Sequence, residues 1–254
     1  MTIERFLAFK GITNFRDFGG YPLSCGGRLR QSWLFRSGHH GDATRSDLVR
    51  LEGLGLVAIV DLRGGAERRA ISCPRPSSVH LFEVEEQTAN LLGPLTGAAR
   101  ERPGGFDAIR LMREGYATMP YRWRLRGALK NSFEAVAKAD GPILIHCAAG
   151  KDRTGLAVAL IHAAMGVHRD DIIADYLLTR EAPRLPGSED GLQIAFDNML
   201  SEGDADVLLS VSPDYIEAAL DAIVARHRTV GAYLAEHLSI PSEWIERMRE
   251  RLIV

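Results

Sequence analysis

Short apolar runs alternate along the chain with longer stretches in which apolar residues recur at helical spacing. Leu56–Arg63 and Pro142–Ile145 are apolar runs that charged or polar residues end, and Val79–Phe82 is expected to be a short strand. Continuous apolar runs of this length are typical of buried strands in a parallel sheet. Strands that alternate with helices predict an α/β fold with a central, mostly parallel twisted sheet flanked by helices.

The helical stretches carry recognisable ends. Thr44 with Asp47 three residues later predicts a helix start. Further helices are expected at Phe106–Tyr116, from Pro120 onward, at Leu156–Met165, from Ser212 to about His227 and in a terminal segment after Pro241. In the helix that Pro120 opens, the following positions have near-helical spacing and are expected in the core: Trp123, Leu125, Leu129, Phe133 and Val136.

One strand–loop–helix unit carries the clearest chemistry. The run Pro142–Ile145 leads into His146–Gly155, and the helical run Leu156–Met165 follows. A loop that opens a helix points several backbone N–H groups at one place, and the helix dipole adds partial positive charge there. The unit therefore predicts an anion site, and phosphate is the anion that it suits best.

The side chains of this loop agree with chemistry on phosphate. Cys147 stands where local positive charge favours a thiolate nucleophile, and the planar fork of Arg153 matches two phosphate oxygens. Gly150 allows the backbone to approach the anion. The Thr154 hydroxyl is placed to hydrogen-bond the sulfur and help it leave, and His146 is placed to brace the loop from behind.

The other two cysteines, Cys25 and Cys73, lack such surroundings in the sequence. A cysteine of this kind is usually a small buried hydrophobic residue. An odd number of cysteines, three in a chain of 254 residues, argues against a disulfide scaffold and for a reducing compartment. A protective disulfide between Cys147 and Cys25 or Cys73 would require Cα atoms within about 7 Å.

The string from His146 to Gly155 has the form H-C-x-x-G-x-x-R-T-G, which resembles the phosphate-binding loop of the cysteine-dependent protein tyrosine phosphatases. Its Gly-Lys-Asp-Arg-Thr version is similar to the bacterial subgroup of mycobacterial protein tyrosine phosphatase B. Asn14–Tyr21, Leu34–Gly38 and the Val-Asp-Leu-Arg string at residues 60–63 also resemble that subgroup, so the resemblance spans roughly residues 12 to 252. It implies a tyrosine-phosphatase-like fold and activity on phosphotyrosine, and often on phosphoserine, phosphothreonine or phosphoinositides.

These residues predict phosphoryl transfer in two steps through a cysteinyl-phosphate, with Cys147 as the nucleophile. Arg153 and the backbone N–H groups of the loop are expected to hold the equatorial oxygens. The predicted substrate-binding residues of the loop are Ala148, Ala149, Gly150 and Lys151. Neither a metal ion nor another cofactor is expected, because the loop and Arg153 supply the charge stabilisation that a metal would otherwise give.

The general acid has several candidates. Asp152 lies in the loop and is the favoured residue in the subgroup. Lys151 and Arg153 flank it and favour its ionised form, which suits a base better than an acid, although a bound phosphate dianion partly offsets this. The chain lacks a Trp-Pro-Asp string after Val79–Phe82. The other candidates are Asp61 and then the group Glu83, Glu85 and Glu86.

Three charged residues near these strands have simpler expected roles. Arg63 is expected to form an internal ion pair that fixes loops, and Asp61 is expected at the carboxyl end of its strand beside the phosphate loop. Glu67 is expected at the solvated start of a helix. Lys151 adds a positive charge that suits a polyphosphorylated head group, so phosphoinositide or inositol-phosphate hydrolysis stands as the alternative function.

The length suits one phosphatase domain over residues 1–254 with an insertion at about residues 88–120. Glycine and proline interrupt that stretch, and the resemblance implies a helical lid there. Residues 100–130 hold eight Lys or Arg against three Asp or Glu. Such a surface is either a solvated helix face or a surface that attracts a polyanionic substrate or an anionic membrane.

The net charge of −2 argues against a general nucleic-acid binder. We expect no signal peptide in Met1–Lys10 and no membrane-spanning segment, and hence a cytoplasmic protein, with export without a cleaved signal left open. The expected partners are a phosphorylated protein or a phosphoinositide, with transient membrane contact. Two alternatives of another class are an inactive phosphate-binding module, against which the intact Cys147 and Arg153 argue, and sulfur transfer on a rhodanese-like loop.

Overall fold

The fold centres on a five-stranded sheet with the strand order β1-β2-β5-β3-β4. The computed structural model describes residues 5–85, 96–97, 107–183, 187–197 and 200–254. The strands are β1 (Arg16–Asp17), β2 (Leu34–Ser37), β3 (Ala58–Asp61), β4 (His80–Phe82) and β5 (Ile143–His146). β1 pairs antiparallel with β2, and the other pairs are parallel. The predicted α/β class with a mostly parallel sheet is therefore confirmed.

The strands separate two hydrophobic cores because successive side chains of a strand point to opposite faces. In β5, Ile143 and Ile145 belong to the larger core, whereas Leu144 belongs to the smaller one. In β3, Val60 faces the larger core and Ile59 the smaller one. This burial on both faces explains why these strands are continuous apolar runs in the sequence.

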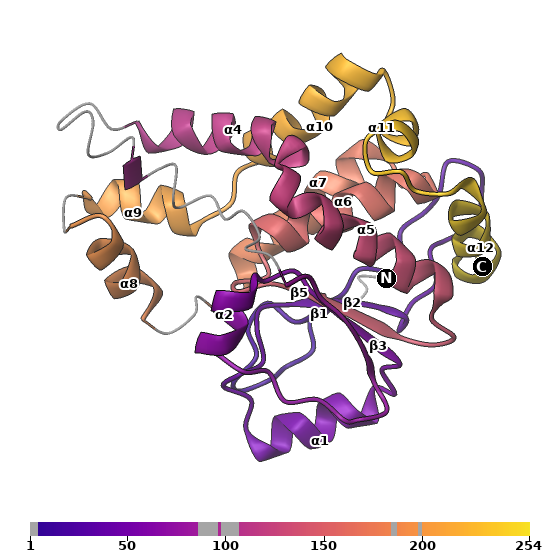
Figure 1. Ribbon diagram of the computed structural model, residues 1–254, viewed down its shortest axis with the longest axis horizontal. Helices are drawn as coiled ribbons and strands as arrows, with labels where there is room; N and C mark the ends of the chain where they lie inside the picture. The colour runs from indigo at the N-terminus through magenta and orange to yellow at the C-terminus, as the bar shows by residue number, and fades with distance from the viewer. Residues whose placement is uncertain (1–4, 86–95, 98–106, 184–186, 198–199) are drawn as a thin grey trace.

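Helices cover both faces of the sheet (Figure 1). The α-helices are α1 (Arg45–Gly53), α2 (Gly65–Ala70), α4 (Ala108–Thr118), α5 (Trp123–Lys138), α6 (Asp152–Met165), α7 (Arg169–Leu177), α8 (Ser188–Ala195), α9 (Glu202–Leu209), α10 (Pro213–His227), α11 (Val230–Glu236) and α12 (Ser242–Leu252). Two short 3-10 helices, η1 (Met119–Tyr121) and η2 (Leu178–Glu181), join some of them. Figure 1 shows α1 on one side of the sheet and α5, α6 and the C-terminal helices on the other.

Most predicted helix starts agree with the structure, and one core assignment is wrong. Thr44 and Asp47 form the expected capping box at α1. Pro120 lies in η1, so α5 begins at Trp123 instead. Trp123 is 69% exposed, whereas the other four predicted core positions of α5 are buried. As the first residue of the helix, Trp123 extends past the packed part of α5, where the Arg124 guanidinium lies over its ring.

Much of the predicted insertion lies outside the described residues, namely residues 88–95 and 98–106. Its described helix, α4, begins two residues later than predicted and ends two residues later. The single-domain organisation and the lid stay predictions. Among the helices that the structure describes, none has the length and apolar character that a membrane span requires.

Candidate active site

The loop that follows β5 lies where three parallel strands end. In the sheet, His146 is paired with Ser37 of β2 on one side and with Asp61 of β3 on the other. The loop runs from there to Asp152, where α6 begins. Ligands of open α/β sheets bind at the carboxyl ends of the strands. The structure therefore puts the predicted phosphate loop at the edge where such a fold binds its ligands.

Hydrogen bonds hold the carbonyl groups of the loop residues Ala148–Gly150 toward the protein framework. The backbone N–H of His39 donates to the Ala148 carbonyl at 2.8 Å. The Asn14 side chain donates to the carbonyls of Ala149 and Gly150 at 3.3 Å and 2.9 Å. The Arg36 guanidinium also donates to the Gly150 carbonyl at 2.9 Å. These contacts give the Asn14–Tyr21 segment a role in the site that the sequence did not indicate.

The orientation of these carbonyls determines where the loop N–H groups point. In a planar trans peptide the N–H lies opposite the C=O, so the N–H groups of Ala149, Gly150 and Lys151 point away from that framework. Within the described residues, the backbone N–H groups from Ala148 to Lys151 donate to no carbonyl or side chain. Together with the N-terminus of α6, they form an anion-binding arrangement.

Gly150 meets a steric requirement of this loop. Its φ of +66° lies in the left-handed region, which favours glycine. A Cβ atom there would lie 2.4 Å from the carbonyl carbon of Ser37 and 2.6 Å from the nitrogen of Gly38. The close approach of the loop to the end of β2 thus depends on the absence of a side chain.

Cys147 and Arg153 lie at the two ends of this loop, and both are buried. The Arg153 guanidinium donates to both carboxylate oxygens of Glu67, from Nη1 at 2.6 Å and from Nη2 at 2.7 Å. Burial by itself would lower the pKa of Arg153, but the hydrogen bonds to Glu67 and the nearby charges raise it above its ordinary value. Arg153 is therefore a cation at every working pH, and its fork has a fixed orientation.

Glu67 is a site residue that the sequence analysis missed. A helix starts there as predicted, but the Glu67 carboxylate is half-buried and paired with Arg153 instead of solvated. Its side chain is 30% exposed and also accepts from the Gly64 N–H at 3.0 Å, which caps α2. Burial would raise the pKa of Glu67, but Arg153 lowers it below the ordinary value. Its contact partner lies 86 positions away, so local sequence gave no sign of it.

Asp152 lies at the start of α6 beside two buried tyrosines. Its Oδ1 accepts from the Tyr116 hydroxyl at 2.5 Å, and that hydroxyl lies 2.7 Å from the Tyr176 hydroxyl. Burial raises the pKa of Tyr116 well above its ordinary value, and the Asp152 charge adds to this effect. Tyr116 therefore stays protonated and fixes the carboxylate. The hydroxyl group of the buried Tyr176 is part of this network.

The Lys151 ammonium is directed at the protein. It donates to the carbonyls of Leu208 at 2.6 Å and Ser210 at 3.1 Å, and lies 3.5 Å from the Asp152 carboxylate. These groups account for the donors of an ammonium, and the residue is buried. Lys151 ties the loop to the end of α9 in this structure.

Asp61, Arg63 and His146 form a buried group behind the loop. Arg63 donates to Asp61 from Nε at 2.9 Å and from Nη2 at 2.7 Å, so the predicted internal ion pair is confirmed. Burial would raise the pKa of Asp61, but His146 and Arg63 lower it. His146 Nε2 lies 3.7 Å from Asp61, and its Nδ1 lies 3.3 Å from the Cys147 carbonyl. The His146 ring thus approaches the first peptide of the loop, and the supporting role expected for Asp61 and His146 stays a prediction.

The remaining candidates for the acid are placed differently. Glu83 is paired with Arg68 at 3.1 Å, and Glu85 is exposed. Glu86 lies outside the described residues. Thr154 is fully buried, and its hydroxyl has no hydrogen-bond partner in the described part of the chain. Its hydrogen bond to the Cys147 sulfur stays a prediction.

The cysteines differ from the expectation drawn from their sequence context. All three are free thiols. Cys25 is exposed, so its assignment as a buried hydrophobic residue is wrong. Cys73 is half-buried and accepts a hydrogen bond from Arg63 at 3.1 Å. Its surroundings are therefore polar as well.

A buried ionic group braces the loop from the far side. Asp175 of α7 lies 2.7 Å from the Arg36 guanidinium and 3.6 Å from that of Arg16, and the three side chains are at most 1% exposed. Arg36 also holds the Gly150 carbonyl. The buried Asp175 carboxylate thus holds Arg36, which in turn holds the phosphate loop.

We expect Asp175→Asn to destabilise the fold by about 3–5 kcal/mol, because it leaves two buried guanidinium groups without their counterion. Burial would raise the pKa of Asp175, but Arg16 and Arg36 lower it to about 2. The stabilisation is therefore complete above the ordinary carboxyl pKa of about 4 and disappears as the pH falls toward about 2. Urea unfolding of the wild type and of Asp175→Asn should show that the difference in their free energies of unfolding becomes smaller as the pH falls from about 4 to about 2.

Asp221→Asn is the control for this measurement, since Asp221 pairs with Arg169 on the surface and is 64% exposed. We expect it to change the stability by less than about 1 kcal/mol. Equal losses for the two variants would contradict a special role for the buried carboxylate.

Comparison with known proteins agrees with this geometry. The model of the tyrosine phosphatase family matches residues 7–254. A protein of Cupriavidus necator whose name describes a tyrosine-protein phosphatase is 35% identical over 242 residues, covering 92% of this chain and 84% of the relative. The triple specificity protein phosphatase PtpB of Mycobacterium tuberculosis is 30% identical over 274 residues, covering 96% of this chain and 97% of the relative.

Proposed function

The chain belongs to the tyrosine phosphatase family, and on that premise we propose that it removes phosphate from phosphotyrosine through a cysteinyl-phosphate on Cys147. Cys147 attacks phosphorus in line with the leaving oxygen. The loop N–H groups and the Arg153 guanidinium bind the equatorial oxygens and match the charge of the transition state. Water then hydrolyses the thiophosphate.

The orientation of the loop peptides is the observation that carries this proposal. Asn14, Arg36 and the His39 backbone hold successive loop carbonyls toward the protein framework. The N–H groups of the same peptides point the other way and can bind an anion. Glu67 orients the Arg153 guanidinium by binding its Nη1 and Nη2 groups, and preorganised donors stabilise a transition state most effectively.

Asp152 serves as the general acid in the first step and as the base in the second. Tyr116 and Lys151 fix its carboxyl group at the mouth of the loop, and its side chain is 27% exposed and so open to water and substrate. Asp61, by contrast, is buried and bound by Arg63. Among the described carboxyl groups considered for this role, Asp152 therefore fits best.

A leaving-group series tests the acid. We expect Asp152→Asn to lower kcat on a phosphotyrosine peptide by about 10²-fold, within the range of general acid catalysis. The loss on 4-nitrophenyl phosphate should be clearly smaller, because nitrophenolate leaves with little need for a proton. Glu83→Gln is the matched control and should leave both rates nearly unchanged. A leaving-group-dependent loss in Glu83→Gln would instead assign the acid to the segment after β4.

The overall proposal is tested by hydrolysis of a phosphotyrosine peptide in EDTA, with vanadate as the inhibitor. We expect turnover without metal and a phosphorylated Cys147 peptide after rapid acid quench. Peptides with phosphoserine and phosphothreonine belong in the same assay, because the name of the mycobacterial relative describes triple specificity. Vanadate binding without turnover would favour the inactive phosphate-binding module, and sulfur transfer from thiosulfate would favour the rhodanese-like alternative.

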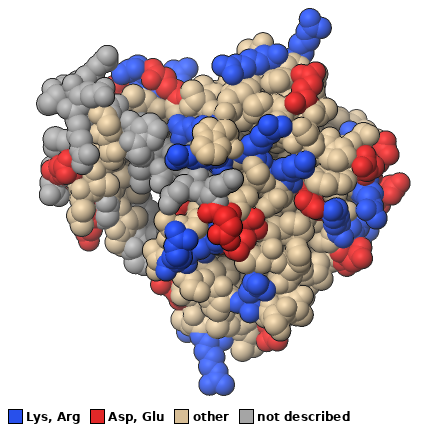
Figure 2. All heavy atoms as spheres, in the orientation of Figure 1, with Lys and Arg blue, Asp and Glu red and all other residues tan. Residues whose placement is uncertain are grey.

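The phosphoinositide alternative gains no support from the described residues. The cation that suggested it, Lys151, donates to two backbone carbonyls of the protein. Contact of the basic residues 100–130 with an anionic membrane and a cytoplasmic location stay predictions from the sequence. In Figure 2 several Lys and Arg side chains occur in the upper half of the molecule. Some of the basic residues are paired on the surface, such as Arg110 with Glu114.

A further inference from the structure

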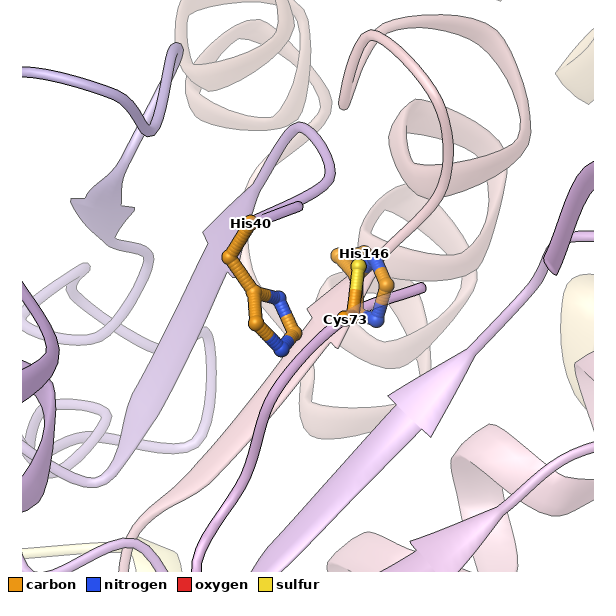
Figure 3. A group of neighbouring side chains, drawn as sticks. All are labelled: His40, Cys73 and His146. Carbon is orange, nitrogen blue, oxygen red and sulfur yellow. The ribbon is translucent and has the colours of Figure 1, made fainter. Parts of the chain in front are cut away.

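Behind the phosphate loop, His40, Cys73 and His146 come together from three separate segments (Figure 3). His40 follows β2, Cys73 follows α2 and His146 ends β5. One ligand atom from each residue lies within 4.8 Å of the other two. Two imidazoles and one thiol at this spacing are a donor set that proteins use for zinc.

The two histidines are buried, and their ring nitrogens are not satisfied. His40 is 1% exposed and His146 is fully buried. Both ring nitrogens of His40 lack a hydrogen-bond partner among the described residues, and so does Nε2 of His146. Buried polar atoms are rarely left without a partner. These three nitrogens therefore point to a ligand.

A cavity of about 160 Å³ is lined by all three residues. It has room for a metal ion and for a water as a fourth ligand, since a water needs only about 10–15 Å³ of such volume. Tetrahedral zinc has ligands at about 2.0–2.3 Å, so the three atoms must move closer together. Cys73 is the half-buried member of the three, so rotation of its side chain supplies part of this movement.

The protonation states suit a metal ion as well. Two buried imidazoles with unpartnered ring nitrogens can offer neutral nitrogen atoms, the form that binds a metal ion. The Cys73 sulfur binds a metal ion as the thiolate. Metal binding then replaces one proton, the thiol proton of Cys73, by the ion.

The other charged groups of the cavity wall select the kind of ion. They are Asp61, Arg63, Arg68, Arg75 and Glu83. Arg63 is paired with Asp61, and Arg68 with Glu83, so both carboxylates among the described residues of the wall already have a cationic partner. Mg²⁺ and Ca²⁺ require such oxygen ligands, whereas imidazole and thiolate suit Zn²⁺.

We propose that His40, Cys73 and His146 form a zinc site that joins the segments after β2 and α2 to the back of the phosphate loop. Binding forms a bond from zinc to the Cys73 sulfur and to one nitrogen of each imidazole, and it releases the Cys73 proton to solvent. The hydrogen bond from Arg63 to the sulfur, 3.1 Å long, remains and orients the thiolate. The ion takes no part in phosphoryl transfer.

Calorimetric titration with ZnCl₂ tests this site in the full chain carrying Cys147→Ser, which removes the catalytic thiolate as a competing ligand. We expect one tight site for zinc and none for MgCl₂. Titrations in buffers of different ionisation enthalpy should give the release of about one proton per ion. A rise in the thermal unfolding midpoint with zinc should accompany binding, because a ligand of the native state stabilises it.

Two further substitutions in the same background locate the ligands. Cys73→Ser and His40→Gln should each weaken zinc binding by about 100-fold or more, whereas Cys25→Ser should leave it unchanged. With Co²⁺ in place of zinc, a thiolate-to-cobalt charge-transfer band should appear and should vanish with Cys73→Ser alone. Circular dichroism in EDTA shows whether each variant is folded.

Several outcomes would overturn the site: no zinc binding in the Cys147→Ser protein, binding that survives both substitutions, or a cobalt spectrum without a thiolate band. If Cys73→Ser does not fold, the cobalt band compared between the Cys147→Ser protein and its Cys25→Ser derivative still identifies the thiolate. None of these results bears on the phosphatase proposal, because the site is measured without turnover.

Discussion

Replacing Cys147 by serine is expected to lower kcat on a phosphotyrosine peptide by about 10⁴-fold or more, as removal of a nucleophile does in other covalent enzymes. A serine hydroxyl attacks phosphorus poorly, because it is a far weaker nucleophile than a thiolate. The substitution changes one buried atom and leaves the loop N–H groups and Arg153 in place. Peptide hydrolysis in EDTA measures the loss.

Substrate binding separates this loss from damage to the loop. We expect the Cys147→Ser protein still to bind the phosphotyrosine peptide, with a Kd close to the Ki of the same peptide as a competing substrate of the wild type, because the anion-binding groups remain. Cys25→Ser is the matched control and should keep full activity, since Cys25 is exposed. Activity of the serine variant within about tenfold of the wild type would refute the covalent mechanism.

The sheet could be predicted from the sequence, because strands that are buried on both faces are continuous apolar runs. β3 and β5 are continuous apolar runs for this reason, and the helix dipole and glycine requirements of the loop between β5 and α6 are local as well. Cys147, Gly150 and Arg153 were therefore predictable from one stretch of ten residues.

The parts that could not be predicted depend on contacts between distant positions. Glu67 meets Arg153 across 86 positions, and Asn14 meets Gly150 across 136 positions. Nothing near Glu67 in the chain distinguishes it from a solvated glutamate. Asn14 and Arg36 lie in segments that carry a family resemblance, which signalled importance without indicating that both hold the loop carbonyls.

The error at Trp123 has a different cause. Its spacing to Leu125 and Leu129 fits a helix, but helical spacing does not say where packing begins along the helix axis. Trp123 is the first residue of α5, and the preceding turn is the 3-10 helix around Pro120. The periodicity therefore identified the correct face of the helix and overestimated the length of its buried part.

Arg153→Lys is expected to lower kcat by about 10³-fold, which corresponds to about 4 kcal/mol of transition-state stabilisation. Lysine keeps the positive charge but loses the planar fork that binds two phosphate oxygens at once. A lysine ammonium also cannot form the two parallel hydrogen bonds by which Glu67 orients the Arg153 guanidinium. The loss should appear mainly in kcat, because the contact strengthens as charge develops in the transition state.

Glu67→Gln tests whether Glu67 acts through Arg153. The amide oxygen still accepts one hydrogen bond, so we expect a smaller loss of about tenfold in kcat, with little change in stability. In the Arg153→Lys background the same substitution should have almost no further effect, because the fork that Glu67 positions is gone. Independent, multiplicative losses in the double variant would show that Glu67 contributes by another route, such as its cap on α2.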